Sequence, residues 1–93
     1  MEFQNVEGRD AGEVTLYALS TCGWCKKTRD IIDSLGVRYR YVYVDLLDEK
    51  GRNEAVEIIK KLNPNLSFPT VDVNGKIIVG FKDEELKELL KGE

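Results

Sequence analysis

Alternating apolar and polar positions predict four short strands along the chain. In the first of them, the apolar residues Val14, Leu16 and Ala18 occupy every second position, and the uncharged residues between them allow burial on both faces. The dipeptide Asn74-Gly75 separates the last two strands and favours a two-residue turn, so these strands form an antiparallel hairpin. The predicted strands cover residues 13–19, 37–45, 70–73 and 76–79.

Three segments between and after the strands repeat their apolar residues with the period of a helix. In the second segment, Ala55, Ile58, Ile59 and Leu62 form one apolar stripe, and Asp48 is placed to cap its first turn. A glycine at position 36 ends the first helix. The predicted helices cover residues 23–35, the segment from Asp48 to Leu62 that Asn63-Pro64-Asn65 ends, and the segment from Asp83 to Leu90.

The elements therefore follow one another as strand, helix, strand, helix, hairpin, helix. A strand-helix-strand unit normally makes a right-handed crossover to a parallel neighbour, and the hairpin has to extend the same sheet to bury its apolar face. The pattern predicts one α/β domain over residues 13–93, with a four-stranded mixed sheet flanked by three helices. Residues 1–12 show no period and are interpreted as a loose N-terminal arm.

Three tyrosines, Tyr39, Tyr41 and Tyr43, share one face of the second predicted strand. Such a row can serve as a stacking platform for nucleic-acid bases. The row of tyrosines can also pack beneath a helix, and we favour this second interpretation.

Composition and charge exclude several classes of function. The chain has 93 residues and a net charge of -3, which gives no electrostatic basis for binding nucleic acid or a membrane surface. It contains two Cys and no His, so Ser-His and Cys-His nucleophile pairs and His-containing zinc sites are ruled out. No apolar run approaches the roughly 18 residues of a membrane span, and residues 1–12 lack the apolar core of a secretion signal. We therefore expect a cytoplasmic protein, where a close Cys pair is seldom a structural crosslink.

The two cysteines, Cys22 and Cys25, lie where the first predicted strand passes into the first predicted helix. Cys22 is at or next to the N-cap, where free backbone N–H groups and the positive end of the helix dipole stabilise a thiolate. At about 100° per residue, Cys22 has nearly the azimuth of Lys26 and Arg29, whereas Cys25 is turned about 60° toward the apolar stripe. This asymmetry favours a two-step exchange, in which Cys22 attacks a substrate disulfide and Cys25 then displaces the substrate thiol.

Two residues between the cysteines affect access to the pair. Gly23 has no side chain and keeps the approach to Cys22 open. Trp24 offers apolar surface beside the cysteines, which either contacts a substrate or shields the thiols. The alternatives to redox chemistry are a zinc half-site and a pair of inert thiols. Zinc normally takes four protein ligands, which two Cys without His do not supply, so no metal is expected. Inert thiols are disfavoured because C-x-x-C at a strand-to-helix junction is a specific redox signal.

Three motifs together resemble the glutaredoxin and thioredoxin superfamily, and in particular the small glutaredoxin-like and NrdH-type redoxins. The resemblance extends roughly from Val14 to Leu90. It implies the thioredoxin fold and a dithiol oxidoreductase that acts on small disulfides or on disulfide-containing proteins such as ribonucleotide reductase. The motifs are Thr21-Cys22-Gly23-Trp24-Cys25, Ser67-Phe68-Pro69-Thr70 and Val79-Gly80-Phe81-Lys82-Asp83.

The resemblance also implies the residues of a substrate site around the two catalytic cysteines. It implies a cis peptide bond before Pro69, close to the active-site sulfurs, and it implies that the N–H and C=O groups of Phe68 pair with a substrate cysteine as an added strand edge would. The substrate-binding residues that follow from it are Thr21, Gly23, Trp24, Lys26, Phe68, Pro69, Gly80 and Phe81.

The motifs depart from those of glutathione-dependent members at two places. Such members usually carry Lys or Arg three residues before the first Cys, where this chain has Leu19. They also carry two successive Gly followed by Asp, whereas here Val79 precedes a single Gly and Lys82 stands near the expected acid. Gly80 followed by Phe81 is more similar to the NrdH-type redoxins.

The resemblance therefore implies a thioredoxin-reductase-type enzyme as the electron source in preference to glutathione. We expect a monomer that needs no cofactor beyond its redox-active disulfide between Cys22 and Cys25. Two alternatives stay open. One is a glutathione-dependent glutaredoxin in which Lys26 or Lys82 holds a carboxylate, and the other is an iron–sulfur cluster held between two chains by Cys22 and glutathione.

Overall fold

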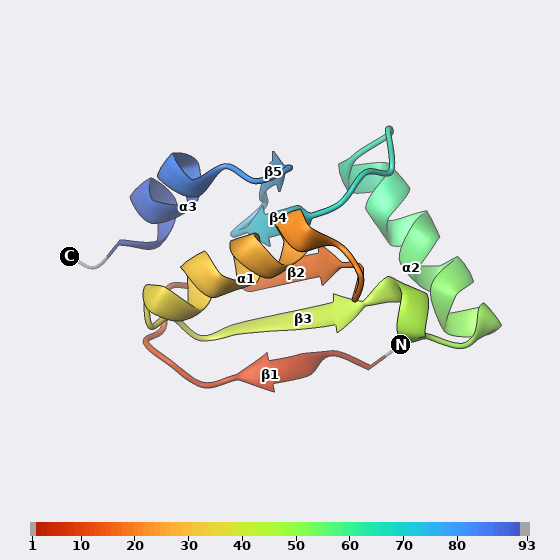
Figure 1. Cartoon of the computed structure of the whole chain (residues 1–93), viewed down its shortest axis with the longest axis horizontal. Helices are drawn as coiled ribbons and strands as arrows, with labels where there is room; N and C mark the ends of the chain where they lie inside the picture. The colour runs from red at the N-terminus through yellow and green to blue at the C-terminus, as the bar shows by residue number, and fades with distance from the viewer. Residues whose placement is uncertain (1, 92–93) are drawn as a thin grey trace.

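The computed structural model describes residues 2–91, and within them five strands form one mixed sheet in the order β1-β3-β2-β4-β5 (Figure 1). The central strand, β2, pairs in parallel with β3 and antiparallel with β4, and β4 continues into the antiparallel hairpin with β5. The strands are β1 (Gln4–Val6), β2 (Val14–Ala18), β3 (Tyr39–Tyr43), β4 (Thr70–Val73) and β5 (Lys76–Val79). The helices are α1 (Gly23–Ser34), the 3-10 turn η1 (Val44–Leu46), α2 (Glu49–Leu62) and α3 (Asp83–Leu90).

Strand β2 is buried on both faces, as its pattern predicted, and it divides the core in two. On one face, Val14 and Leu16 pack with residues of α1 and α3. On the other face, Tyr17 packs with Ala55 and Ile59 of α2. Figure 1 shows α1 in front of β2. No helix within residues 2–91 is both long enough and apolar enough to span a bilayer.

The predicted helix boundaries agree with the structure because the capping residues are in place. The Asp48 carboxylate accepts the Gly51 N–H at 2.7 Å, so Asp48 is the N-cap of α2. After the end of α1, Gly36 has a φ of +68°, the left-handed conformation that favours glycine. Ile58, which the stripe placed on the buried side of α2, is 39% exposed because the helix buries a narrower face centred on Ala55 and Ile59.

The three tyrosines of β3 pack beneath α1, which confirms the favoured interpretation. Arg29 of α1 donates from Nε to the Tyr39 hydroxyl and from Nη1 to the Tyr43 hydroxyl, each at 3.1 Å. Its guanidinium carbon lies 4.0 Å from the centre of the Tyr41 ring. One arginine therefore binds all three aromatic side chains and covers the face on which bases would have to stack.

The predicted four-stranded sheet is wrong in its strand count, and residues 1–12 are not simply a loose arm. Within that segment, Gln4–Val6 forms β1, which pairs antiparallel with β3. The strand is short and mostly polar, so it carries no alternation that a sequence pattern can detect, and a short polar strand is typical of a sheet edge. Phe3 anchors this segment, because its ring lies 6.0 Å from that of Tyr17 and the Arg40 guanidinium stacks on it at 4.2 Å.

This anchoring predicts the effect of shortening Phe3. The Phe3→Ala variant loses its ring contacts with Tyr17 and Arg40, so the free energy of unfolding should fall by about 1–2 kcal/mol in urea titrations of the reduced protein. Gln4→Ala is the matched control, because Gln4 is the next residue along and is exposed, so its replacement should change stability little. Equal stability of Phe3→Ala and the unmodified protein would contradict the anchoring role.

Candidate active site

Cys22 is the N-cap residue of α1, as the strand-to-helix junction predicted. Its backbone is extended, with φ of -95° and ψ of 117°, and its Sγ accepts the N–H of Cys25 at 3.2 Å. Its carbonyl accepts the N–H of Lys26 at 3.1 Å, and its own N–H donates to the Leu19 carbonyl at 3.3 Å. The half-buried Cys22 is thus the N-cap of α1, and its sulfur accepts a hydrogen bond from one of the otherwise unpaired N–H groups of the first turn.

Cys25 lies one turn further along α1 and has a different environment. Its side chain is 1% exposed and packs within the core beneath α1. Burial, followed by the hydrogen bond with Cys22, raises the pKa of the Cys25 thiol to about 12. Both cysteines are free thiols in this structure. The two sulfurs are therefore unequal, because one is reachable from solvent and the other is held neutral and covered.

Five of the predicted substrate-binding residues, from three separate segments, meet in one groove. The Trp24 ring from α1 lies 5.4 Å from the Phe81 ring, which precedes α3. The bond between Phe68 and Pro69 is cis, and the Pro69 carbonyl accepts the N–H of Gly80 at 2.8 Å. The aromatic groove, as we call it, has a volume of about 260 Å³ and is lined by Trp24, Phe68, Pro69, Gly80 and Phe81.

The other predicted substrate-binding residues lie outside the aromatic groove. Lys26 lines a second groove of about 270 Å³, which also contains Cys22, and its ammonium pairs with Asp30 at 3.6 Å. Thr21 is exposed on the turn just before Cys22. A Cβ added to Gly23 would meet no atom within 4 Å, in agreement with an open approach to the sulfur. The charged groove, as we call it, is lined by Leu19, Ser20, Cys22, Lys26, Arg29, Asp30, Asp33 and Tyr43.

Sequence reasoning missed a contact at the Cys22 turn, between Ser20 within the turn and Asp45 outside it. The backbone N–H of Ser20 donates to Asp45 Oδ1 at 2.8 Å, and the Ser20 hydroxyl donates to Asp45 Oδ2. The signal that could have found them is the parallel pairing of the first two predicted strands, because parallel strands end at the same edge of a sheet.

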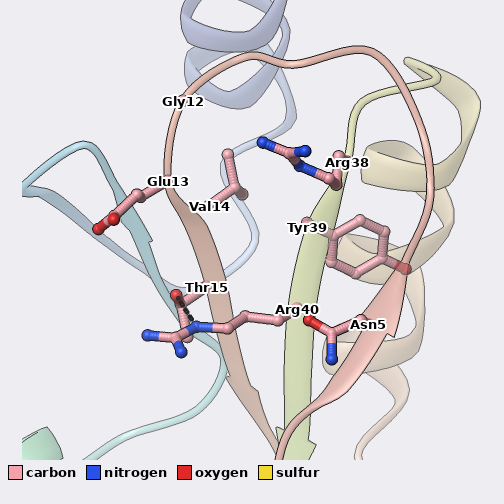
Figure 2. A pocket seen from close by; sticks show the side chains of 8 residues that line it. All are labelled: Asn5, Gly12, Glu13, Val14, Thr15, Arg38, Tyr39 and Arg40. Atoms are coloured by element: carbon pink, nitrogen blue, oxygen red, sulfur yellow. Dashed lines mark hydrogen bonds between the residues drawn. The ribbon is translucent and has the colours of Figure 1, made fainter.

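A cavity at the opposite end of β2 and β3 contains neither cysteine (Figure 2). In it, the Arg40 Nε donates to the Thr15 hydroxyl at 3.0 Å, as the dashed line shows. It lies where β2 begins, whereas the cysteines follow the point where β2 ends. The cavity is lined by Asn5, Gly12, Glu13, Val14, Thr15, Arg38, Tyr39 and Arg40. Within residues 2–91, no group of three or more His, Cys, Asp or Glu side chains is arranged to hold a metal ion.

Comparison with known proteins gives consistent matches. The family model for glutaredoxin matches residues 14–78. The crystal structure of a glutaredoxin from Methanosarcina mazei Go1 is 50% identical, covers 95% of this chain and 86% of its own, and superposes with a TM-score of 0.87. The structure of Methanosarcina acetivorans methanoredoxin is 46% identical over 89% of this chain and 88% of its own, with a TM-score of 0.87. An uncharacterized glutaredoxin-like protein of 8.6 kDa in a rubredoxin operon of Clostridium pasteurianum is 30% identical over 78 residues, which are 84% of this chain and 97% of the relative.

The unequal environments of the two thiols predict selective alkylation. Iodoacetamide at pH 7.5 should add one group to the reduced folded protein, at Cys22, because Cys25 is buried and its pKa is raised to about 12. Intact-mass and peptide analysis would identify the modified residue. The Cys22→Ser variant should take up no group while folded and one group in denaturant. Equal rates of modification at both cysteines would contradict the assignment.

Proposed function

The chain belongs to the glutaredoxin family and has the thioredoxin fold, and from this premise we propose that it is a dithiol oxidoreductase in which Cys22 attacks disulfides and Cys25 resolves the mixed disulfide. One observation carries the proposal: a half-buried sulfur caps α1, and a fully buried thiol lies one turn behind it. The backbone N–H of Cys25 donates a hydrogen bond to Cys22 Sγ at 3.2 Å. In other thiol enzymes, a histidine side chain makes the corresponding polar contact with the sulfur.

In the first step, the Cys22 thiolate attacks one sulfur of a substrate disulfide. A bond forms between Cys22 Sγ and that sulfur, the substrate S–S bond breaks, and the second substrate sulfur leaves as a thiolate that takes a proton from water. The sulfur that is attacked stays attached to Cys22. The protein has then formed a mixed disulfide with one substrate sulfur, and the other substrate sulfur is a free thiol.

In the second step, Cys25 releases the substrate. The Cys25 thiol gives up its proton and attacks Cys22 Sγ, the mixed disulfide breaks, and the remaining substrate sulfur leaves as a thiolate that is protonated. Two electrons have passed from the dithiol to the substrate, and Cys22 and Cys25 form a disulfide. Burial keeps Cys25 neutral until this step, so the attacking role falls to Cys22.

The aromatic groove supports binding of the substrate chain beside Cys22. Phe68 lies two residues before the first residue of β4, Thr70, so its backbone lies outside the strand pairs of the described sheet. An extended substrate segment can add to such a backbone as a strand adds to a sheet edge. Trp24 is 57% exposed and, with Phe81, offers apolar surface to the side chains of that segment.

Single substitutions of the cysteines test the two roles. Cys22→Ser should abolish reduction of insulin and of small disulfides, because no nucleophile remains to form the mixed disulfide. Cys25→Ser should form the mixed disulfide and then stall, so that mass spectrometry detects a covalent adduct of protein and substrate. Circular dichroism would check that both variants fold. Retention of the full rate by the Cys22→Ser variant would contradict the mechanism.

The proposal extends to the electron source, which we take to be a thioredoxin-reductase-type enzyme rather than glutathione. Leu19 lines the charged groove beside Cys22 and brings no cation to bind a glutathione carboxylate. Phe81 follows the single Gly80, and its ring occupies space over Trp24 that a second glycine would leave open. Both features support a surface for a protein partner over a site for a small peptide.

An NADPH-coupled assay compares the two electron sources directly. Thioredoxin reductase should recharge the oxidised protein faster than glutathione with glutathione reductase does. Leu19→Lys should raise kcat/KM for glutathione by roughly fivefold, the effect of one surface ion pair worth about 1 kcal/mol, and Leu19→Met should not. Recharging by glutathione alone would reverse the proposed order.

A further inference from the structure

The carboxylate of Asp45 binds the residue that leads into the active-site turn. Strands β2 and β3 run in parallel with Ala18 opposite Tyr43, and two residues further along each chain Ser20 lies opposite Asp45. The Ser20 N–H donates to Asp45 Oδ1 at 2.8 Å, and the Ser20 hydroxyl donates to Oδ2. One carboxylate thus accepts both donors of a single residue, which fixes the orientation of Ser20 as well as its position.

Ser20 belongs to the tight turn that carries the attacking sulfur. The turn runs from Leu19 to Cys22 and is closed by the Cys22 N–H, which donates to the Leu19 carbonyl at 3.3 Å. Beyond the turn, Cys22 Sγ is held by the N–H of Cys25 at 3.2 Å. The carboxylate therefore secures the turn from the side of the sheet, and α1 secures it from the other side. Leu19 and Ser20 also form a wall of the charged groove beside Cys22.

The Asp45 carboxylate is also a fixed negative charge close to the thiol pair. The Ser20 hydroxyl and then the Ser20 N–H lower the pKa of Asp45, so the group stays ionised at neutral pH and keeps both hydrogen bonds. Its charge adds to the causes that raise the pKa of Cys25, after burial and the contact with Cys22. Within residues 2–91, Cys22 and Asp45 are the titratable groups that act on Cys25.

We propose that Asp45 is a positioning residue for the thiol-disulfide exchange, which holds the turn of Cys22 through its two hydrogen bonds with Ser20. This inference rests on the proposed function. Loss of the Ser20 hydroxyl should then slow the attack by Cys22, because the turn is held at one point instead of two.

The attack by Cys22 can be measured apart from the resolving step in a single-turnover reaction with Ellman's reagent. The first thionitrobenzoate is released when Cys22 attacks, and the second when Cys25 resolves the mixed disulfide, so each step has its own absorbance signal. Ser20→Ala should slow the first release roughly fivefold, the equivalent of about one hydrogen bond, and Ser20→Thr should restore it because threonine keeps both donors. Asp45→Asn should slow the first release as Ser20→Ala does, because the amide oxygen still accepts the Ser20 N–H but the amide nitrogen cannot accept from the Ser20 hydroxyl.

Asp48→Asn is the matched control, because Asp48 lies three residues after Asp45 and caps α2 through the Gly51 N–H. This variant removes a carboxylate but keeps the cap, because the asparagine oxygen still accepts the Gly51 N–H, and it should leave both release rates unchanged. If Asp45→Asn and Ser20→Ala also leave the first release rate unchanged, the proposal is overturned. If Asp45→Asn does not fold, the comparison of Ser20→Ala with Ser20→Thr still decides it. Absence of a second release from the unmodified protein would instead contradict the proposed function.

Discussion

The hydrogen bond from the Cys25 N–H to Cys22 Sγ is the interaction on which the site depends. It exists because α1 begins directly after β2, at the end of the central strand of the sheet. This chain has no histidine, and the first turn of a helix is where unpaired backbone N–H groups are available to a sulfur. In the proposed function, the start of α1 therefore takes part in the chemistry in addition to carrying the cysteines.

The same junction explains why the two thiols differ although only two residues separate them. A residue at the N-cap lies outside the helix and faces solvent, whereas the residue three positions later is within the first turn and points toward the sheet. Cys25 is consequently packed in the core with residues of α1 and α3, and burial raises its pKa. A shift of Cys25 by one residue, to the exposed positions of Trp24 or Lys26, would place both sulfurs in solvent, and the inequality on which the proposed order of attack and resolution depends would be lost.

Much of this arrangement could be predicted from local sequence signals. The cap at Asp48, the turn at Asn74-Gly75 and the helix start at Cys22 depend on neighbours within a few residues, and all three are found. The strand β1 could not be predicted, because its stability comes from pairing with β3 across more than thirty residues and its own sequence is polar. The contact between Ser20 and Asp45 was missed for the same reason, since it exists only after two parallel strands are aligned.

The resemblance to known redoxins identified a set of site residues but not how they divide between two surfaces. Five of them line the aromatic groove, whereas Lys26 lies with Cys22 in the charged groove. The aromatic groove combines Trp24 of α1 with the loops before β4 and α3, and the charged groove combines α1 with the turn of Cys22 and the end of β3. The two loops can therefore change without disturbing the turn that holds Cys22, whereas a change at Trp24 would act between the two cysteines. Under the proposed function, the exchange step would be kept while partners differ, because most of the aromatic groove rests on elements outside that turn.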